Sequence, residues 1–507
     1  MAINQRKAGA ILSYSIITFN ILVGLLYTPY MLQKMGQNEY GLYALVASVI
    51  GYLTILDFGF GNAVIRYTAK FRAEGKQAQQ SAMYGMFIGL YSLIGLLALV
   101  AGCVLYFNVD NIFGHSMANW ELDKARILMI IMVVNIAFTF PLSVFRGIIT
   151  AYEDFIFIRV IQLVRIALNT IVMVVLLAYG YKAIGMAMVM TFFNLATLLI
   201  NYLYSKHRLK IQIRFTKIPF SFLREVMLYS FWIFLGIIMD KIYWNTGQFV
   251  LGAVSGTVAV AIFAVAIQLE GMYMTFSNAI QGVFLPKVTS MISTGSSEEE
   301  VSNLFIRIGR VQNYIVLFIV MGFMIFGELF IYYWAGADYG DVYYIALLFF
   351  VALFVPLIQN IGLLVLQAKN QMKFRSVLYV CIALVCLGLQ LPLAKAYGGI
   401  GCAIAISGAL LLGQGLIMNI YYHRVQHLNI LRFWKQIIQI SIPLLVMSFA
   451  FKWLLTTFVI SPSIPQVLLM IGAFSLLYWF IAIAISMNKY EKELLLKPLL
   501  KIYQRLK

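Results

Sequence analysis

The stretch AMYGMFIGLYSLIGLLALVAGCVLYF, residues Ala82–Phe107, contains no charged side chain. A helix that crosses the hydrocarbon core of a bilayer needs roughly 20 mostly apolar residues, and this stretch exceeds that length. Strands of a membrane barrel are shorter and alternate apolar with polar residues, so a helix is the expected structure. The stretch therefore predicts a membrane-spanning helix.

The rest of the chain repeats this pattern. Of 507 residues, 62% are hydrophobic and only 11% are charged, whereas globular chains are roughly 45–50% apolar and about 25% charged. Such a surplus of apolar side chains needs lipid as its solvent, which excludes a soluble enzyme, a secreted domain and a disordered chain. We predict an all-α polytopic membrane protein with 14 transmembrane helices. The predicted spans are 8–30, 41–65, 82–107, 126–149, 159–179, 183–205, 226–251, 257–285, 309–334, 342–367, 376–396, 399–421, 437–459 and 465–487.

The basic residues predict the orientation of these spans. With the N-terminus in the cytoplasm, 29 of the 37 Lys and Arg residues fall on cytoplasmic segments, as the positive-inside rule requires. Both termini are therefore expected in the cytoplasm. The same distribution explains the net charge of +18 without any nucleic acid as a partner.

An internal repeat of about 215 residues divides the chain. Phe140-Pro141-Leu142 is echoed by Val355-Pro356-Leu357, and Ile184-Gly185-Met186-Ala187 by Ile400-Gly401-Cys402-Ala403. The repeat contains six spans, an even number, so we expect two parallel six-helix lobes related by an axis along the membrane normal. The predicted domains are an N-terminal lobe (1–216), a C-terminal lobe (217–436), and two extra helices with a basic cytoplasmic tail (437–507).

Two such lobes are typical of a carrier whose central cavity opens alternately to the two sides of the membrane. The sequence has no GxxxxGK[ST] phosphate-binding loop, so we expect a transporter without nucleotide hydrolysis. A membrane glycosyl-transfer enzyme is the alternative from another class. It is disfavoured because such enzymes usually carry a large external loop, and all predicted outer loops here are short.

Two motifs carry a resemblance to a known family. The stretches Gly36–Leu45 (GQNEYGLYAL) and Leu56–Arg66 (LDFGFGNAVIR) resemble the opening of bacterial polysaccharide transporters, the oligosaccharide flippases of the multidrug/oligosaccharidyl-lipid/polysaccharide (MOP) exporter superfamily. The turn Tyr333–Tyr339 (YWAGADY) is similar as well, and the resemblance extends over essentially the whole chain.

The resemblance implies an alternating-access flippase in the bacterial cytoplasmic (inner) membrane. Its substrate would be an undecaprenyl-pyrophosphate-linked oligosaccharide, exported for lipopolysaccharide, capsule or exopolysaccharide biosynthesis. Membrane lipids, a polysaccharide polymerase and glycosyltransferases are the partners it implies. One alternative is a lipid II flippase for peptidoglycan, although the arginines expected in its first span are absent here. Another is a multidrug or cation antiporter of the same superfamily, which usually has twelve spans.

Ionisable side chains inside the predicted spans are the candidates for a functional site, because a charge in lipid costs several kcal/mol unless it faces a wet cavity. A pyrophosphate headgroup needs cations, and arginine can bind two phosphate oxygens at once. The candidate substrate-binding residues, which would form a cationic cavity, are Arg66, Arg146, Arg165 and Lys241. For Arg66 and Arg146, near the inner ends of their spans, extension to the membrane interface explains the charge equally well.

The candidates for ion coupling are the acidic residues Asp57, Asp240 and Glu270. A carboxylate at mid-membrane is costly to keep charged, so it can take up a proton or a Na⁺ from one side. Without a nucleotide motif, export has to be coupled to such an ion or driven by consumption of the product outside. No cofactor and no metal site is expected. An interhelical salt bridge with Lys241 is the structural alternative for Asp240 or Glu270.

Overall fold

The computed structural model describes residues 5–216, 219–369, 371–458 and 464–493. Every regular element within these ranges is a helix, which confirms the predicted all-α membrane fold. The basic tail predicted at the C-terminus lies, from residue 494 onwards, outside the described residues. The α-helices are α1 (Gln5–Met35), α2 (Gln37–Leu53), α3 (Phe60–Ala73), α4 (Gln77–Phe107), α5 (Val109–Phe113), α6 (Asn119–Ala151), α7 (Phe155–Ala178), α8 (Ala183–His207), α9 (Phe220–Trp244), α10 (Thr246–Val254), α11 (Thr257–Ser293), α12 (Glu298–Trp334), α13 (Asp341–Ile358), α14 (Asn360–Ala368), α15 (Met372–Leu410), α16 (Met418–Arg424), α17 (Ile430–Phe458) and α18 (Ile464–Ile481). Short 3₁₀ segments cover Thr54–Asp57 and Ala337–Tyr339, and π-helical segments cover Leu411–Ile417 and Ala482–Ser486.

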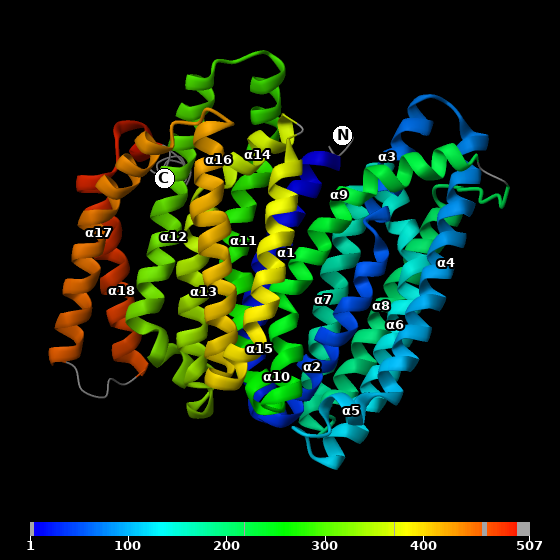
Figure 1. Cartoon of the computed structure of the whole chain (residues 1–507), viewed down its shortest axis with the longest axis horizontal. Helices are drawn as coiled ribbons and strands as arrows, with labels where there is room; N and C mark the ends of the chain where they lie inside the picture. Colours follow the sequence, from blue (N-terminus) through cyan, green and yellow to red (C-terminus); the bar gives the residue numbers. More distant parts are fainter. Residues whose placement is uncertain (1–4, 217–218, 370, 459–463, 494–507) are drawn as a thin grey trace, which may run out of the picture. The chain divides into compact units, whose positions relative to one another are not determined.

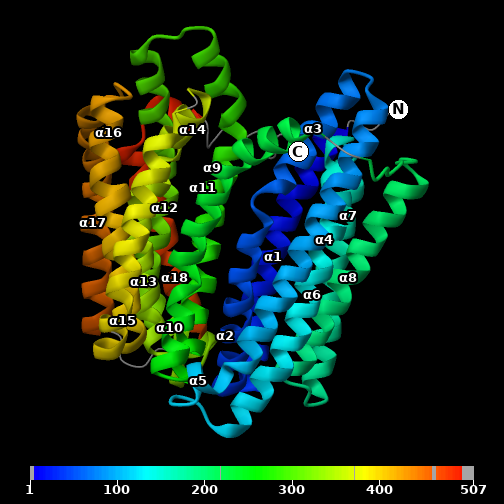
Figure 2. The same cartoon turned by 45° about the vertical axis from the view of Figure 1, so that its right-hand side comes forward.

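The internal contacts of the chain divide it into two compact units. The first contains residues 1–265 and 379–405, and the second contains residues 266–378 and 406–507. In the first unit α6 packs against α4 and α8, and α1 packs against α7 (Figures 1 and 2). In the second unit α12 packs against α13 and α17. The lobes that the repeat predicts, 1–216 and 217–436, stay a prediction.

Thirteen helical runs among the described residues are long and apolar enough to cross a membrane. One of them, Met372–Arg424, has 53 residues, and a helix of that length would be more than twice as long as the roughly 30 Å hydrocarbon core is thick. Within it, Gly398 has φ 57° and ψ −134°, which is not helical. A side chain on Gly401 would collide with the backbone of Leu393, so the chain turns back on itself here. This hairpin coincides with the predicted eleventh and twelfth spans and favours fourteen crossings, a count that stays a prediction.

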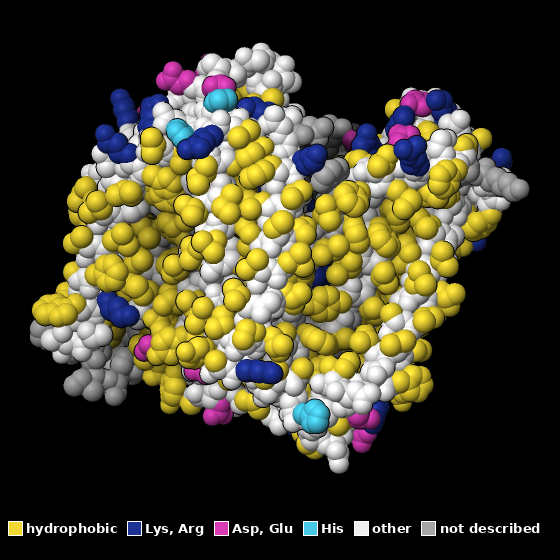
Figure 3. Space-filling model, in the orientation of Figure 1, with side chains coloured by type: hydrophobic (Ala, Val, Ile, Leu, Met, Phe, Trp, Pro, Cys, Tyr) yellow, Lys and Arg dark blue, Asp and Glu magenta, His cyan; other side chains and the backbone are white. Residues whose placement is uncertain are grey.

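The helices of the first unit approach each other through small residues. On α4, side chains added at Gly95 and Gly102 would collide with Ala137 and Val133 of α6, so glycine allows the two helices to pack closely. The other side of α4 exposes large apolar residues such as Leu96. Figure 3 shows the same pattern on the surface, with hydrophobic side chains along the helices and most Lys and Arg near their ends. A surface of this kind fits a lipid environment.

The predicted second span is broken in the middle. After α2 the chain forms the 3₁₀ segment Thr54–Asp57 and then places Phe58 (φ 51°) and Gly59 (φ 73°) in the left-handed region before α3 begins. A glycine tolerates this conformation without a steric penalty, whereas the helix cannot continue through it. The sequence predicted one span over 41–65, in which Gly59 and Gly61 fit a bend as well as close helix packing, and the apolar pattern alone does not reveal the break.

A buried ion pair fastens the C-terminal helices of the second unit to α12. Arg310 donates from Nε to Oε1 of Glu491 (2.6 Å) and from NH2 to Oε2 (2.9 Å), with side-chain exposures of 11% and 1%. The hydroxyl of Tyr314 donates to the carbonyl of Ser486 at 2.8 Å. The segment that follows α18 is therefore held against α12 by charge and by a second hydrogen bond.

Glu491→Gln should destabilise the protein by about 3 kcal/mol, because Arg310 is then left buried without its counter-charge. Thermal unfolding of the detergent-solubilised protein, followed by circular dichroism, measures the change. The matched control is Glu299→Gln, since Glu299 pairs with Arg432 at 3.9 Å on an exposed surface. It should cost less than about 1 kcal/mol. Equal losses in the two variants would show that the buried pair contributes no more stability than the exposed one.

Candidate functional site

A cavity of about 280 Å³ lies inside the first unit, between four helices and the start of the break in the second span. Helices α2, α6, α7 and α8 supply its walls, and Thr54 of the 3₁₀ segment closes one side. The lining residues are Tyr43, Ala47, Ile50, Gly51, Thr54, Met132, Asn135, Ile136, Thr139, Arg165, Ala187, Met190, Thr191 and Asn194. One charged side chain, Arg165, is among them, and no carboxylate is.

Uncharged polar side chains form one wall of this cavity. The amide of Asn194 donates to Oδ1 of Asn135 and to Oγ1 of Thr139, both at 2.7 Å. Asn135 and Thr139 are one turn apart and so share a face of α6. The hydroxyl of Thr191, on the next turn of α8, is buried and has no hydrogen-bond partner among the described residues. The wall thus offers a polar surface inside an apolar bundle.

Arg165 brings a cation to the cavity. Its guanidinium interacts electrostatically with that of Arg146 at the end of α6, and Arg146 interacts in turn with Arg159 at the start of α7. Within the described ranges, none of these three arginines forms an ion pair. Like charges near each other without counter-ions attract an anion, so Arg146 and Arg165 make this region electropositive, and their role in substrate binding stays a prediction.

Lys241 approaches the same region from α9. A Cβ atom placed on Gly51 would lie 3.7 Å from Nζ of Lys241, and Gly51 itself lines the cavity. Asp240 precedes Lys241, is exposed, and interacts with it electrostatically. Lys241 is therefore near the cavity wall, although it is not one of the lining residues.

Arg66 lies elsewhere in the first unit. Its guanidinium is exposed and stands over the ring of Tyr229 of α9, 4.4 Å from the ring centre. It does not line the cavity. The cation–π contact gives this arginine a packing role between α3 and α9.

Asp57 is held by three donors at the break in the second span. The hydroxyl of Tyr91 donates to its Oδ1 at 2.6 Å, and the backbone N–H groups of Gly59 and Gly61 donate to the same carboxylate. These N–H groups lie at the start of α3, where they have no partner within the helix. The contacts favour a structural role, in which Asp57 caps α3 and stabilises the break.

Glu270 belongs to the second unit. It is buried on α11, with 4% of the residue exposed. Because a buried glutamate in a membrane-spanning helix is costly to keep charged, Glu270 remains a candidate for ion coupling, and this role stays a prediction.

The sequence reasoning missed the amide and hydroxyl wall of the cavity. It considered ionisable residues only, whereas Asn135 and Asn194 are neutral. Their signal in the sequence is nevertheless visible, because each is an amide in the middle of an otherwise apolar span. A search for all polar residues within the spans would have found them.

The fold and the cavity together define a polytopic helical membrane protein with a polar site inside one helix bundle. The chain belongs to the polysaccharide biosynthesis protein family, whose match covers residues 7–292. This confirms the resemblance found in the sequence. A search of curated proteins gave no match.

Solved structures with the same fold belong to transporters. The lipid II flippase MurJ in an inward closed conformation superposes with a TM-score of 0.71 at 15% identity, over 97% of this chain and 99% of that chain. A multidrug resistance MATE family transporter of the MOP superfamily, inward-facing, gives 0.67 at 13% identity, over 84% and 99%. A MOP superfamily transporter from Pyrococcus furiosus gives 0.54 at 13% identity, over 82% and 94%. The chain therefore has the fold of MOP superfamily transporters.

If Asp57 is structural, Asp57→Asn and Tyr91→Phe should each lower the free energy of unfolding by about 1–2 kcal/mol, because the first removes the charge that strengthens this part-buried hydrogen bond and the second removes its donor. The double variant should lose less than the sum of the two, by at least about 0.5 kcal/mol, since the residues share one interaction. Thermal unfolding in detergent measures all three variants. Unchanged stability in both single variants would remove the structural role and leave Asp57 free for ion exchange.

Proposed function

We propose that this protein is an alternating-access flippase that exports lipid-linked (undecaprenyl-pyrophosphate) oligosaccharide across the cytoplasmic membrane for surface polysaccharide biosynthesis. The observation that carries the proposal is the cationic cavity of the first unit, which combines Arg165 with a wall of amides and hydroxyls. A pyrophosphate is an anion with several acceptor oxygens, and a sugar carries hydroxyl groups. The cavity offers a partner for each.

Arg165 is the residue proposed to bind the pyrophosphate. Its planar guanidinium can donate to two phosphate oxygens at once, whereas a lysine acts as a point charge. Arg146, near the end of α6, interacts with it electrostatically and adds positive charge on that side. Asn194 and Thr191 of α8 line the same cavity, where they can contact sugar hydroxyls. Lys241, near Gly51, adds charge from α9.

The cellular setting belongs to the same proposal. Both termini lie in the cytoplasm, and the substrate enters from the inner leaflet, where glycosyltransferases assemble it. A polysaccharide polymerase uses it on the outer side. The product is a lipopolysaccharide, capsule or exopolysaccharide, and the protein itself is a transporter and not an enzyme.

The two alternatives differ in what the cavity has to bind. A multidrug or cation antiporter needs acidic groups in its N-terminal cavity, and here the charged lining residue is an arginine. A lipid II flippase has a pyrophosphate substrate too, and its fold is the one seen in MurJ. The glycan therefore has to be identified by the transport assay and not by the charge of the cavity.

Arg165→Ala should abolish export of surface glycan, with lipid-linked oligosaccharide accumulating in the inner leaflet, because the pyrophosphate loses its bidentate partner. Arg165→Lys should retain only part of the activity. Flipping of a fluorescent undecaprenyl-pyrophosphate oligosaccharide in proteoliposomes measures the rate, and lipid II in parallel vesicles measures the alternative.

The control for this experiment is Arg432→Ala, which also removes an arginine, but from an exposed surface of the second unit. It should transport normally at an equal amount of protein in the membrane. Normal transport by Arg165→Ala would remove Arg165 from the binding site. Faster flipping of lipid II than of the oligosaccharide would favour the lipid II flippase.

Glu270 is proposed to exchange an ion during the transport cycle. Transport in vesicles should then respond to an imposed proton or Na⁺ gradient, and Glu270→Gln should lose that response while it still binds substrate, because the amide takes up no ion. Transport by Glu270→Gln with an unchanged dependence on the gradient would leave Glu270 with a structural role.

A further inference from the structure

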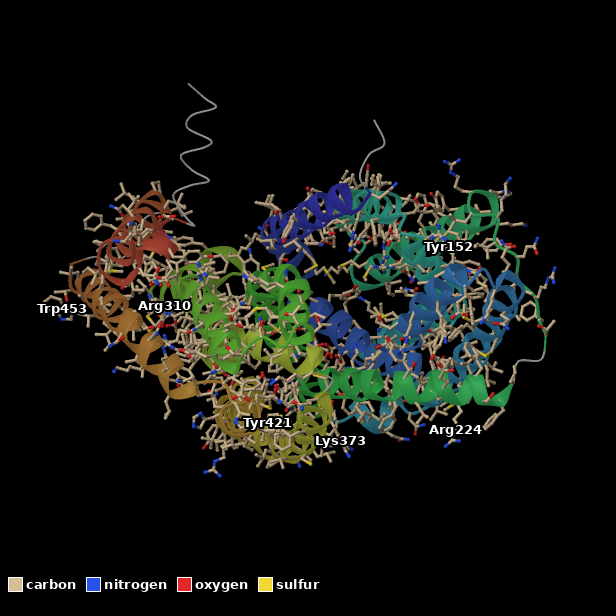
Figure 4. All side chains as sticks on the ribbon, turned by 90° about the horizontal axis from the view of Figure 1, so that it is seen from above. Tyr152, Arg224, Arg310, Lys373, Tyr421 and Trp453 are labelled. Carbon is tan, nitrogen blue, oxygen red and sulfur yellow. The ribbon has the colours of Figure 1, made fainter. Side chains whose placement is uncertain are left out.

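A second cavity, of about 550 Å³, lies at one end of the first unit, where α3, α4, α6 and α8 end or begin. Figure 4 looks onto this end of the helices and labels Tyr152, one of the lining residues. The lining residues are Arg72, Gly75, Gln77, Ala78, Gln80, Ser81, Tyr84, Tyr152, Leu209, Lys210, Ile211, Gln212 and Arg214. We call it the rim cavity. It shares no lining residue with the cavity around Arg165.

One wall of the rim cavity is a non-helical segment, Leu209–Arg214, that follows α8. The backbone N–H of Arg214 donates to the carbonyl of Ser81 on α4 at 3.0 Å. A side chain on Gly85, one turn further along α4, would collide with the backbone of Arg214, so glycine is what allows this close approach. The segment is thus fixed against α4 and gives the cavity a defined wall.

The rim cavity carries a concentrated positive charge. Arg72, Lys210 and Arg214 line it, and no carboxylate does. The guanidinium of Arg72 stands over the ring of Tyr152, 4.3 Å from the ring centre, which keeps it at the cavity wall. Glu74, close in sequence, pairs with Lys76 at 2.7 Å and is not a lining residue. Three cations without an acidic neighbour in the lining favour an anionic ligand.

An apolar groove adjoins the rim cavity on the other side of α4. The groove has a volume of about 420 Å³ and is lined by Phe71, Ala78, Gln79, Ala82, Met83, Pro219 and Phe222. Ala78 lines both spaces, so they meet at the first turn of α4. The rings of Phe71 and Phe222 pack at 5.7 Å and form the apolar floor. A charged pocket next to an apolar groove is complementary to an amphiphile with an anionic head.

We propose that the rim cavity and the groove bind an anionic phospholipid of the membrane, with its phosphate among Arg72, Lys210 and Arg214 and an acyl chain over Phe71 and Phe222. Lys and Arg residues at a membrane surface bind anionic headgroups, and each one raises the affinity for such a lipid about 5-fold. Because the rim cavity shares no lining residue with the Arg165 cavity, the proposal assigns this lipid a resident role, separate from that of the transported lipid. The proposal holds whichever substrate the transport cavity binds.

The test uses the purified, delipidated full-length protein in detergent, titrated with dioleoyl phosphatidylglycerol or with dioleoyl phosphatidylcholine. Native mass spectrometry counts the bound lipids at each concentration. Phosphatidylglycerol should bind at least about 10-fold more tightly than the zwitterionic lipid, since three cations face its net negative charge. Equal affinity for the two lipids would overturn the proposal.

Two triple variants distinguish lipid binding at this site from binding to other basic residues at the same end of the unit. The triple variant Arg72→Gln, Lys210→Gln, Arg214→Gln should weaken phosphatidylglycerol binding about 100-fold. The matched control, Lys70→Gln, Lys206→Gln, Arg224→Gln, removes the same charge at the same end of the unit from residues outside the lining, and should weaken it less than about 5-fold. Equal losses in the two triple variants would overturn the site.

Single variants, a change in the groove and a soluble competitor test the site further. If the triple variant does not fold, as judged by size-exclusion chromatography, the single variants Arg72→Gln and Lys210→Gln should each lose about 5-fold. Phe222→Ser should weaken phosphatidylglycerol binding about 10-fold through the lost apolar contact. Competition by soluble glycerol phosphate at the concentrations at which phosphatidylglycerol binds would show a site for a free anion and overturn the assignment to a lipid.

Discussion

The interior of a bilayer offers no water to a backbone N–H or carbonyl group, and the rest of this structure depends on that constraint. A helix satisfies its own backbone, so the apolar segments are helical throughout the described ranges. Where a helix stops inside the membrane, the chain has to supply other partners. The break between α2 and α3 follows this rule. The carboxylate of Asp57 accepts hydrogen bonds from the N–H groups of Gly59 and Gly61, which have no partner within the helix.

The same constraint separates two kinds of charged residue. Arg310 and Glu491 neutralise each other in a buried, bidentate pair, and their role is to hold helices together. Arg165 lines a cavity, interacts electrostatically with a second arginine, and forms no ion pair with the residues that the structure describes. A membrane protein without a use for such a charge would do better with an apolar side chain there. A charged side chain without a counter-ion is thus a better indication of a functional site than a charged side chain in general.

The sequence predicts the fold well because its main signal is local. The apolar stretch Ala82–Phe107 coincides with most of α4, since length and hydropathy alone determine a spanning helix. The break at Phe58–Gly59 escapes such a prediction, because glycines near Asp57 suit close packing as well as a bend. For the site, Arg165 was predicted from its charge, whereas the wall formed by Asn135 and Asn194 arises from two helices whose facing sides no single sequence reveals.

The hairpin at Gly398 also constrains how the protein is made. Its two legs are joined by a turn so tight that Gly401 lies against the backbone of Leu393. The turn at Gly398 leaves almost no loop between the two legs. Because the two legs are joined so closely, we expect them to insert into the bilayer together as a helical hairpin. In the predicted orientation, Lys395 near the tip crosses the membrane with them.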